Sequence, residues 1–377
     1  MGIKERLGVY FSLVNDSRHQ SYITYKMSDL LLILFVAHIC GLRDEEEIAD
    51  FAEERWEFFK QYIEHHRPPC QSTICNVLKI LNPEQLELCF QGIVRNITGI
   101  KKEIKKQIAI DGKTACGANS IHIVTALDVD NCFSVGQMMV DEKTNEIPTV
   151  TELLDKIPVK DNTITFDAMH CQKDTLEKII TKGGDYAVQV KRNQKTLYND
   201  ISDLFKQKEI IERFEEVEKS NGRISKRVCE VLPYEYITDE YFGKWANIKR
   251  IFRIERQIEK NGKKTKETSY YISSLEESAK NLSKYVRKHW EIESFHWILD
   301  VVMGEDDAFV RNKNSQFCLN IIRKYAISFV KQYIEQEKPK KKSISGNMRK
   351  ALFSCHFMAN MLSFFIHCLL LQLCDIY

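Results

Sequence analysis

The feature that most constrains the fold is a pair of short apolar runs that each end in an aspartate. Residues 107–111 and 163–167 are rich in β-branched and apolar side chains and end at Asp111 and Asp167. Such runs are typical of buried strands, so the pattern predicts two carboxylates at strand ends. We expect further strands at 122–128, 132–140 and 185–191, and helices at 149–157 and 172–181.

The order of these elements is three strands, then helix, strand, helix, strand. This is the order of a ribonuclease H-like α/β fold, in which the first and fourth strands are neighbours. Ligands of open α/β sheets bind at strand ends. We therefore expect Asp111 and Asp167 to meet at one edge of the sheet.

A third acidic residue lies in the Trp-rich segment 289–297, His-Trp-Glu-Ile-Glu-Ser-Phe-His-Trp. At 100° per residue of an α-helix, Glu291 and Glu293 point in nearly opposite directions, so only one can face the aspartates. The pattern alone does not choose between them, and a core helix with solvated carboxylates is the alternative. Two strand-end carboxylates and a helix carboxylate suit two Mg²⁺ or Mn²⁺ ions and phosphoryl transfer.

The first 105 residues have helical periodicity, with apolar faces in 29–40, 46–62 and 73–81. Pro68 and Pro69 stop one helix, and a fresh helix is expected near Ser72 with its first turn exposed. This resembles a helix-turn-helix element that touches DNA. An ordinary helical bundle is the alternative.

A catalytic core is expected at 106–335, interrupted by a β-rich insertion at about 192–278, and a C-terminal basic linker and helix at 336–377. Residues 244–288 hold 13 Lys or Arg against five Glu, which favours phosphate contacts over a merely solvated hairpin face. Trp245, Tyr270 and Tyr271 interleave with these charges and could stack on bases.

Composition excludes several other classes. The net charge of +2 alone gives no sign of a nucleic-acid partner, and the 12 Cys include no Cys-x-x-Cys pair, which favours reduced thiols in the cytoplasm. His66, Cys70 and Cys75 do not have the spacing of a common zinc site. The apolar segment 357–374 carries Asn, Ser, His and Gln, so a buried or oligomer-forming helix is favoured over a membrane span.

Seven sequence blocks resemble the ISAs-type, or H-repeat-associated, insertion-sequence transposases of the DDE superfamily. The blocks are 111–114 (Asp-Gly-Lys-Thr), 143–147, 167–172, 191–194, 222–223, 270–274 and 289–301. The resemblance implies Asp111, Asp167 and Glu293 as the catalytic, metal-binding acids. It also implies that the first helices form the family's associated domain.

A protein of this family would bind the terminal inverted repeats of its element, cleave a DNA strand and join the 3′-OH to target DNA. Its expected partners are double-stranded DNA and a second copy of itself in the DNA complex, on the bacterial nucleoid and away from the membrane. A nuclease of the same fold that does not join strands, or a domesticated DNA-binding protein without catalysis, are the alternatives. The residues expected to contact DNA are Lys113, Lys191, Asn193, Gln194, Arg223, Lys263, Lys264, Lys266 and His289.

Overall fold

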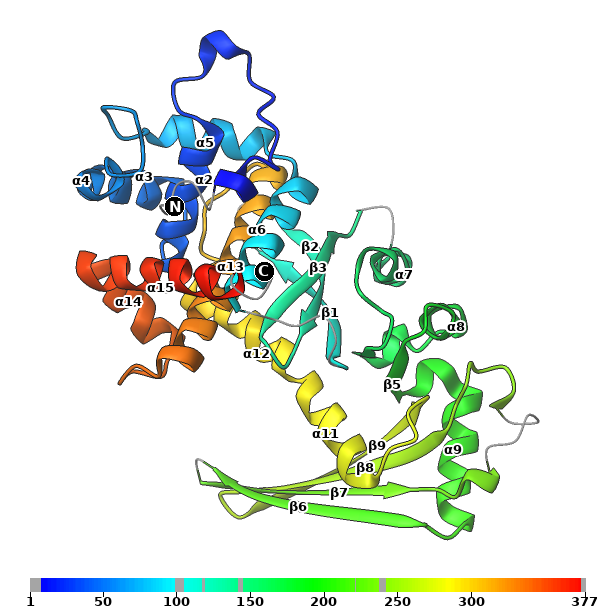
Figure 1. The fold of residues 1–377 in the computed structure, drawn as a ribbon. Coiled ribbons are helices and arrows are strands. Elements are labelled where there is room, and N and C mark those ends of the chain that lie inside the picture. Colours follow the sequence, from blue (N-terminus) through cyan, green and yellow to red (C-terminus); the bar gives the residue numbers. More distant parts are fainter. Residues whose placement is uncertain are drawn as a thin grey trace.

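The structure is a computed structural model that describes residues 8–98, 105–116, 119–141, 145–220, 222–236 and 242–373. Lys143 and Thr144 of block 143–147, and Cys374 at the end of the last expected helix, lie outside the described residues. One mixed sheet, with helices on both faces, organises the chain (Figure 1).

The sheet has nine strands in the order β3-β2-β1-β4-β5-β9-β8-β7-β6. β1 pairs with β2 antiparallel and with β4 parallel, so the expected neighbourhood of the first and fourth strands is present. The strands are β1 (Gln107–Ala115), β2 (Ile121–Asp128), β3 (Phe133–Met139), β4 (Thr163–Phe166), β5 (Asp185–Val190), β6 (Glu212–Ser220), β7 (Arg223–Val231), β8 (Arg250–Lys260) and β9 (Lys263–Ser273).

The expectation that Asp111 ends a strand is wrong. β1 continues to Ala115 because it pairs with β2 as far as Ala115↔Ile121. Its pairing with β4, however, stops at Ile110↔Phe166. Asp111 therefore lies within a strand, but at the place where the neighbouring strand ends.

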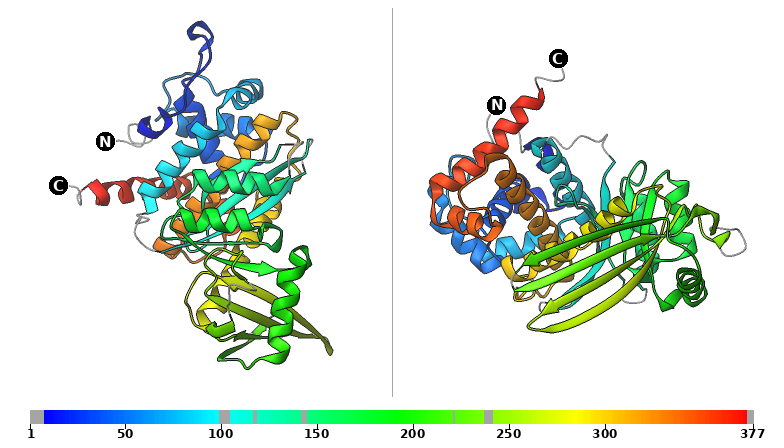
Figure 2. Two further views of the ribbon diagram at one scale, coloured as in Figure 1. Left: turned by 90° about the vertical axis from the view of Figure 1, so that its right-hand side faces the viewer. Right: turned by 90° about the horizontal axis from the view of Figure 1, so that it is seen from below.

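Helices cover both faces of the inner half of the sheet, the strands β3 to β5. α7 and α8 lie on one face, and α11, α12 and α13 contact the other (Figures 1 and 2). The helices of this part are α7 (Glu146–Lys156), η2 (Ala168–His170), α8 (Lys173–Thr181), η3 (Arg192–Gln194), α9 (Lys195–Gln207), η4 (Tyr234–Tyr236), α11 (Ala279–His289), α12 (Glu291–Trp297) and the π-helix η5 (Ile298–Val302).

The first and last helices of the chain pack together around α13 (Lys313–Glu337), which contacts α2, α5 and α6. Two expectations are corrected. The segment 46–62 breaks at Arg55 into two helices, and the C-terminal helix is two helices separated at Ser354. The remaining helices are η1 (Gln20–Tyr22), α2 (Met27–Ile39), α3 (Glu45–Glu54), α4 (Trp56–Phe59), α5 (Gln71–Ile80), α6 (Pro83–Thr98), α14 (Ile344–Phe353) and α15 (Cys355–Leu373).

Across the described part of the chain, every helix is too short or too polar to cross a bilayer.

The β-rich insertion extends the main sheet, because β9 pairs antiparallel with β5. Its β8–β9 hairpin turns at Asn261 and Gly262, whose positive φ values of 51° and 73° explain the Asn-Gly pair. β6 was not expected from the sequence. We call strands β6 to β9 the sheet extension; it has a small core of its own with α11, separate from the main core.

Candidate active site

Two of the expected acids meet at the end of the β1–β4 pairing. Ile110 and Phe166 form the last residue pair between these strands, and Asp111 and Asp167 are the next residue on each. Asp167 also precedes η2 as its N-cap residue. The two carboxylates therefore share one edge of the pairing, and both remain open to solvent, with side chains 25% and 57% exposed.

Glu293 on α12 lies within electrostatic reach of both aspartates. Burial, and then the negative charges of Asp111 and Asp167, raise the pKa of Glu293 above its ordinary value. Glu291 lies on another side of α12, where it lines a cavity of about 300 Å³ together with Cys132, Lys331 and Glu335. The structure thus brings Glu293, and not Glu291, to the aspartate pair.

Two histidines flank Glu293 and contact the two aspartates. His289 Nε2 lies 3.9 Å from Asp167 Oδ1, and its Nδ1 lies 3.2 Å from Thr165 Oγ1. His296 Nδ1 lies 3.5 Å from Asp111 Oδ2. Burial lowers the pKa of His289, against the charges of Asp167 and Asp111, which raise it. His296 was missed from the sequence, although its spacing of seven residues from His289, about two helical turns, places both on one side of a helical pattern.

The three acids supply only oxygen ligands, which suits a hard divalent cation. Among the described residues, no group of three or more His, Cys, Asp and Glu side chains is placed so that it could hold a metal ion. An open carboxylate set of this kind leaves room for water and phosphate oxygens, as Mg²⁺ sites in phosphoryl-transfer enzymes do.

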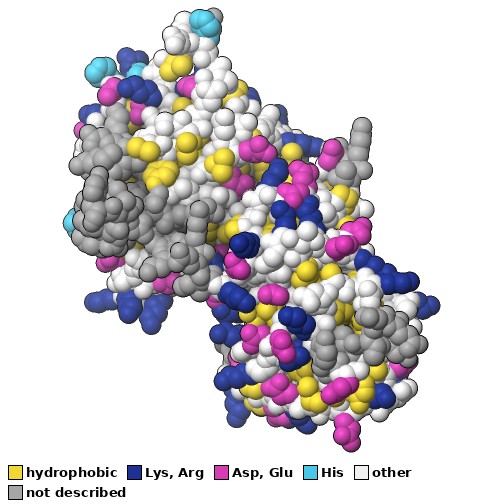
Figure 3. Space-filling view, turned by 45° about the vertical axis from the view of Figure 1, so that its right-hand side comes forward, with side chains coloured by type: hydrophobic (Ala, Val, Ile, Leu, Met, Phe, Trp, Pro, Cys, Tyr) yellow, Lys and Arg dark blue, Asp and Glu magenta, His cyan; other side chains and the backbone are white. Residues whose placement is uncertain are grey.

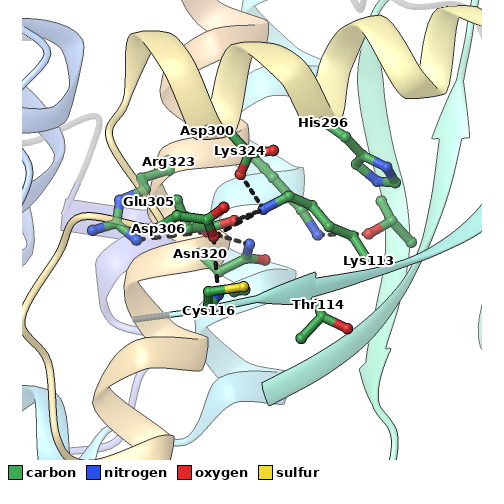
Figure 4. A network of polar contacts seen from close by, with 12 residues as sticks. Lys113, Thr114, Cys116, His296, Asp300, Glu305, Asp306, Asn320, Arg323 and Lys324 are labelled. Carbon is green, nitrogen blue, oxygen red and sulfur yellow. Dashed lines mark hydrogen bonds and ion pairs between the residues drawn. The ribbon is translucent and has the colours of Figure 1, made fainter. Parts of the chain in front are cut away.

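Lys113, an expected DNA contact, lies inside a network of ion pairs (Figure 4). Its Nζ is 2.5 Å from Asp300 Oδ1 and 2.6 Å from Glu305 Oε2. Glu305 also accepts a hydrogen bond of 2.6 Å from Asn320 and pairs with Arg323 at 3.5 Å. Lys113 therefore ties β1 to the helical segment that follows Glu293, with its positive charge balanced by two carboxylates.

Asn193 and Gln194 also make contacts within the protein. Asn193 Nδ2 donates to the Ala168 carbonyl at 2.7 Å, and Gln194 Nε2 donates to the Cys171 carbonyl at 2.9 Å. Both bonds hold the turn that follows Asp167. Lys191, at the end of β5, is exposed.

The two faces of the sheet extension carry different charge arrangements. Arg223, Lys260 and Lys263 are cross-strand neighbours on the face against which α11 packs, which we call the α11 face. Lys264 and Lys266 lie on the opposite, α9 face, because side chains alternate along a strand.

On the α9 face, each of these lysines is balanced by a carboxylate. Lys264 pairs with Glu259 at 3.5 Å and Lys266 with Glu255 at 2.9 Å. A third pair joins Lys226 and Glu215 at 2.5 Å. Figure 3 likewise shows Lys and Arg side chains interspersed with Asp and Glu over the lower part of the molecule.

Several basic side chains of the α11 face form no ion pair within the described part of the chain. Arg256 lies opposite Arg227 on β7 and Glu267 on β9, and its buried Nε has no hydrogen-bond partner among the described residues. Burial, and then the charges of Arg227 and Arg223, lower the pKa of Arg256, against the charge of Glu267, which raises it. In the described part of the chain, Arg223, Arg256, Lys260 and Lys263 have no carboxylate within 4.0 Å.

The aromatic residues expected to stack on bases are buried in the protein and therefore not accessible to DNA. Trp245, Tyr270 and Tyr271 are each only 9% exposed. Tyr270 stacks on Phe205 and Tyr271 on Phe252, so both serve the packing of the extension. The exposed aromatic residues near Glu293 are Trp290 and Trp297.

Comparison with known proteins identifies the family of the chain. Residues 91–329 match the family model "Transposase DDE domain", and residues 9–93 match the model of the DDE_Tnp_1-associated region. The "H repeat-associated putative transposase YhhI" of Escherichia coli (strain K12) is 34% identical over 95% of this chain and 98% of its own length. "Putative transposase YncI" of Escherichia coli O157:H7 is 33% identical over 92% of this chain and 94% of its own length.

Among solved structures, a piggyBac transposase synaptic complex with hairpin DNA aligns with 98% of this chain and 77% of its own, at 10% identity. Its TM-score of 0.47 is too low to carry a structural argument. The family assignment rests on the two family models and on the full-length relatives. The chain belongs to the ISAs-type, H repeat-associated transposases of the DDE superfamily, and it is a transposase enzyme.

Proposed function

We propose that this transposase binds the terminal inverted repeats of its own element, hydrolyses a strand at the element's end and joins the freed 3′-OH to target DNA. One observation carries the proposal: Asp111 and Asp167 follow the last residue pair of β1 and β4, and Glu293 lies within electrostatic reach of both. In this proposal the three carboxylates bind the catalytic metal, and one site serves both cleavage and joining.

The proposed cofactors are two Mg²⁺ or Mn²⁺ ions. The family's general use of divalent metals and the oxygen-only ligand set support this choice. Bound ions would activate the attacking oxygen and stabilise the leaving oxygen of the phosphodiester. His289 and His296 would keep Asp167 and Asp111 oriented through the contacts described above. The exposed carboxylates leave the attacking water or 3′-OH free to enter.

We infer that the inner half of the sheet is a ribonuclease H-like core, within a catalytic domain at 106–335. The order β3-β2-β1-β4-β5, with β1 parallel to β4 and β4 parallel to β5, supports this. Residues 1–105 would be the domain that recognises the element's ends. Its α5 begins at Gln71, so Ser72 lies in an exposed first turn, as a recognition helix requires. Residues 336–377 would form a C-terminal appendage.

DNA would contact exposed Lys191 beside the site and the α11 face of the extension, where Arg223 and Lys263 form no ion pair with any described carboxylate. α11 leads directly from this face to His289 and Glu293 (Figure 1). Trp290 and Trp297 would offer stacking surfaces there. A homodimer holding two element ends, in the bacterial cytoplasm, completes the proposal.

The decisive experiment replaces each acid with its isosteric amide. Asp111→Asn, Asp167→Asn and Glu293→Gln should each reduce cleavage of a duplex bearing the element's end by at least about a thousandfold, while end binding is retained. Glu291→Gln is the matched control, because it changes the same helix outside the site. Wild-type cleavage by Glu293→Gln would remove Glu293 from the site.

Two further measurements separate the alternatives. Mg²⁺ or Mn²⁺ should support cleavage, Ca²⁺ should permit binding with little turnover, and chelator should abolish cleavage. A joining assay with a labelled 3′-OH end distinguishes a transposase from a nuclease of the same fold. Cleavage without any joined product would favour the nuclease.

A further inference from the structure

One carboxylate outside the acidic trio links the two segments that carry the proposed catalytic aspartates. Glu146 is the first residue of α7, and its side chain is 14% exposed. Its Oε2 lies 2.7 Å from His122 Nε2 on β2, and its Oε1 lies 2.7 Å from His170 Nε2 on η2. His170 belongs to the turn that begins at Asp167.

The same carboxylate rests against the backbone next to Asp111. A Cβ added to Gly112 would lie 2.5 Å from Glu146 Cδ and 2.7 Å from Oε1, closer than real Cβ contacts occur. Gly112 has no left-handed backbone conformation to require glycine. The Asp-Gly pair is therefore explained by the close approach of Glu146 to the strand.

The two hydrogen bonds hold the Glu146 carboxyl group between two imidazoles. His122 Nδ1 lies 2.9 Å from the Thr114 hydroxyl, which can donate to it, so His122 Nε2–H donates to Glu146. His170 Nδ1 is buried without a partner among the described residues, so the Glu146 carboxyl group is the hydrogen-bond partner of this imidazole. Burial would raise the pKa of Glu146, but the hydrogen bonds from His170 and His122 outweigh it and hold the pKa below its ordinary value.

We call the contacts of Glu146 with Gly112, His122 and His170 the Glu146 bracket. Its position in the sheet explains why these contacts are needed. Sheet hydrogen bonding between β1 and β4 ends at Ile110↔Phe166, one residue before both aspartates. Beyond that pair, no direct strand pairing fixes the spacing of Asp111 and Asp167. Glu146 contacts Gly112 on one side and His170 on the other, so it joins the two chains where the sheet no longer does.

We propose that Glu146 is a positioning residue, which sets the separation of Asp111 and Asp167 through Gly112 and His170 and so tunes the affinity of the site for divalent metal. The inference rests on the proposed function, because it takes the two aspartates as metal ligands. Support of metal ligands by partners outside the ligand set is typically worth 10- to 100-fold in affinity or activity.

The test uses the full chain and the isosteric variant Glu146→Gln. The amide oxygen can still accept from one imidazole, but its NH₂ group faces the second N–H donor, so one link of the bracket is removed. We expect Mn²⁺ affinity, measured by titration calorimetry, and the cleavage rate both to fall about 10- to 100-fold, with end binding and melting temperature close to wild type. Glu152→Gln is the matched control on the same helix, where Glu152 pairs with Lys156 at the surface, and it should change neither quantity.

A second variant approaches the bracket from the other side. Gly112→Ala places a methyl group where the Glu146 carboxyl lies and should likewise weaken Mn²⁺ binding. The double variant Gly112→Ala/Glu146→Gln should bind Mn²⁺ about as tightly as whichever single variant has the lower affinity, because both substitutions remove the same link.

Three outcomes would overturn the inference. Wild-type Mn²⁺ affinity and cleavage in Glu146→Gln would do so, and so would fully additive losses in the double variant. A loss of activity that merely parallels a loss of melting temperature and end binding would make Glu146 a structural residue only. If wild-type protein does not cleave element ends at all, the proposed function itself fails, so the two failures are distinguishable.

Discussion

The inner half of the sheet and the sheet extension are parts of one hydrogen-bonded sheet built on different principles. All four residues of β4 are buried, whereas β6 has no buried residue and alternates partly exposed and exposed positions. Helices cover both faces of the inner half, while α9 and α11 cover only part of the extension. The inner half fixes side chains that must be placed accurately, and the extension offers charges that remain accessible.

The same contrast holds for ion pairs. In the inner half, Glu305 and Arg323 are each 1% exposed, and Lys113 is nearly buried beside them. Arg323 and Lys113 hold the pKa of Glu305 below its ordinary value in spite of burial, which raises it. In the extension, pairs such as Lys264 with Glu259 lie in solvent. Charge in the first region stabilises a fixed geometry, whereas the exposed pairs of the second region contribute little to stability.

The largest effect is expected from breaking the buried network. Glu305→Gln removes the carboxylate that Lys113 and Arg323 share, and leaves a buried guanidinium without its charge partner. Loss of one partner of a buried pair costs about 3–5 kcal/mol of unfolding free energy. Glu259→Gln in the extension, which removes one exposed pair, should cost less than about 1 kcal/mol. Urea unfolding of both variants measures the two losses of unfolding free energy. Equal losses would show that the two regions do not differ in this respect.

The sequence predicted the inner half well because its signals are local. Apolar β-branched runs ending in aspartate marked β1 and β4, and the strand order placed them side by side. Helical geometry showed that Glu291 and Glu293 cannot face the same partner, and the family resemblance chose Glu293. What the sequence could not show is the continuation of β1 past Asp111, because that depends on pairing with β2.

The extension was harder to predict for a physical reason. β6 reads Glu-Arg-Phe-Glu-Glu-Val-Glu-Lys-Ser, with charged residues on both faces, so it lacks the alternation that marks a half-buried strand. The basic excess of 244–288 was visible, but the fold also brings carboxylates from outside this range to it, as Glu230 of β7 pairs with Arg253 and Glu216 of β6 with Arg287. The Glu146 bracket was missed because its members are 24 residues apart and meet only in the fold.

The next largest effect is expected on DNA binding by the α11 face. Replacing Arg223, Arg256 and Lys263 together with Gln should weaken binding to any duplex sequence and flatten the log-log salt dependence by about 0.9 for each phosphate that the protein no longer neutralises. Within the described part of the chain, none of these three side chains forms an ion pair that would have to break before it meets phosphate. Fluorescence anisotropy titrations at several salt concentrations measure the slope. An unchanged slope would move the DNA path away from the extension.

A smaller effect, independent of catalysis, tests the proximity of the three acids. In metal-free protein, Asp167→Asn should lower the pKa of Glu293, because it removes one of the negative charges that raise it. Because the pKa is raised in wild type, Glu293 loses its proton at higher pH than an ordinary glutamate, and metal binding should strengthen as pH rises through that range. NMR titration of labelled glutamate side chains gives the pKa directly. If the pKa of Glu293 stayed unchanged in both Asp167→Asn and Asp111→Asn, Glu293 would not lie close to the aspartates.

The smallest effect is expected from the α9 face, which serves as the matched control for the α11 face. Lys264→Gln/Lys266→Gln removes two lysines from the same hairpin as Lys263, but both are already paired with glutamates, Glu259 and Glu255. Contact with phosphate would require breaking those pairs, so the net gain from binding is small. Affinity and salt slope should stay close to those of wild-type protein, and stability should change by less than about 1 kcal/mol per pair. If this double variant flattened the salt slope as much as the α11-face variant does, the strand register would not govern DNA binding, and the phosphate backbone would have to follow the hairpin tip, where both faces are within reach.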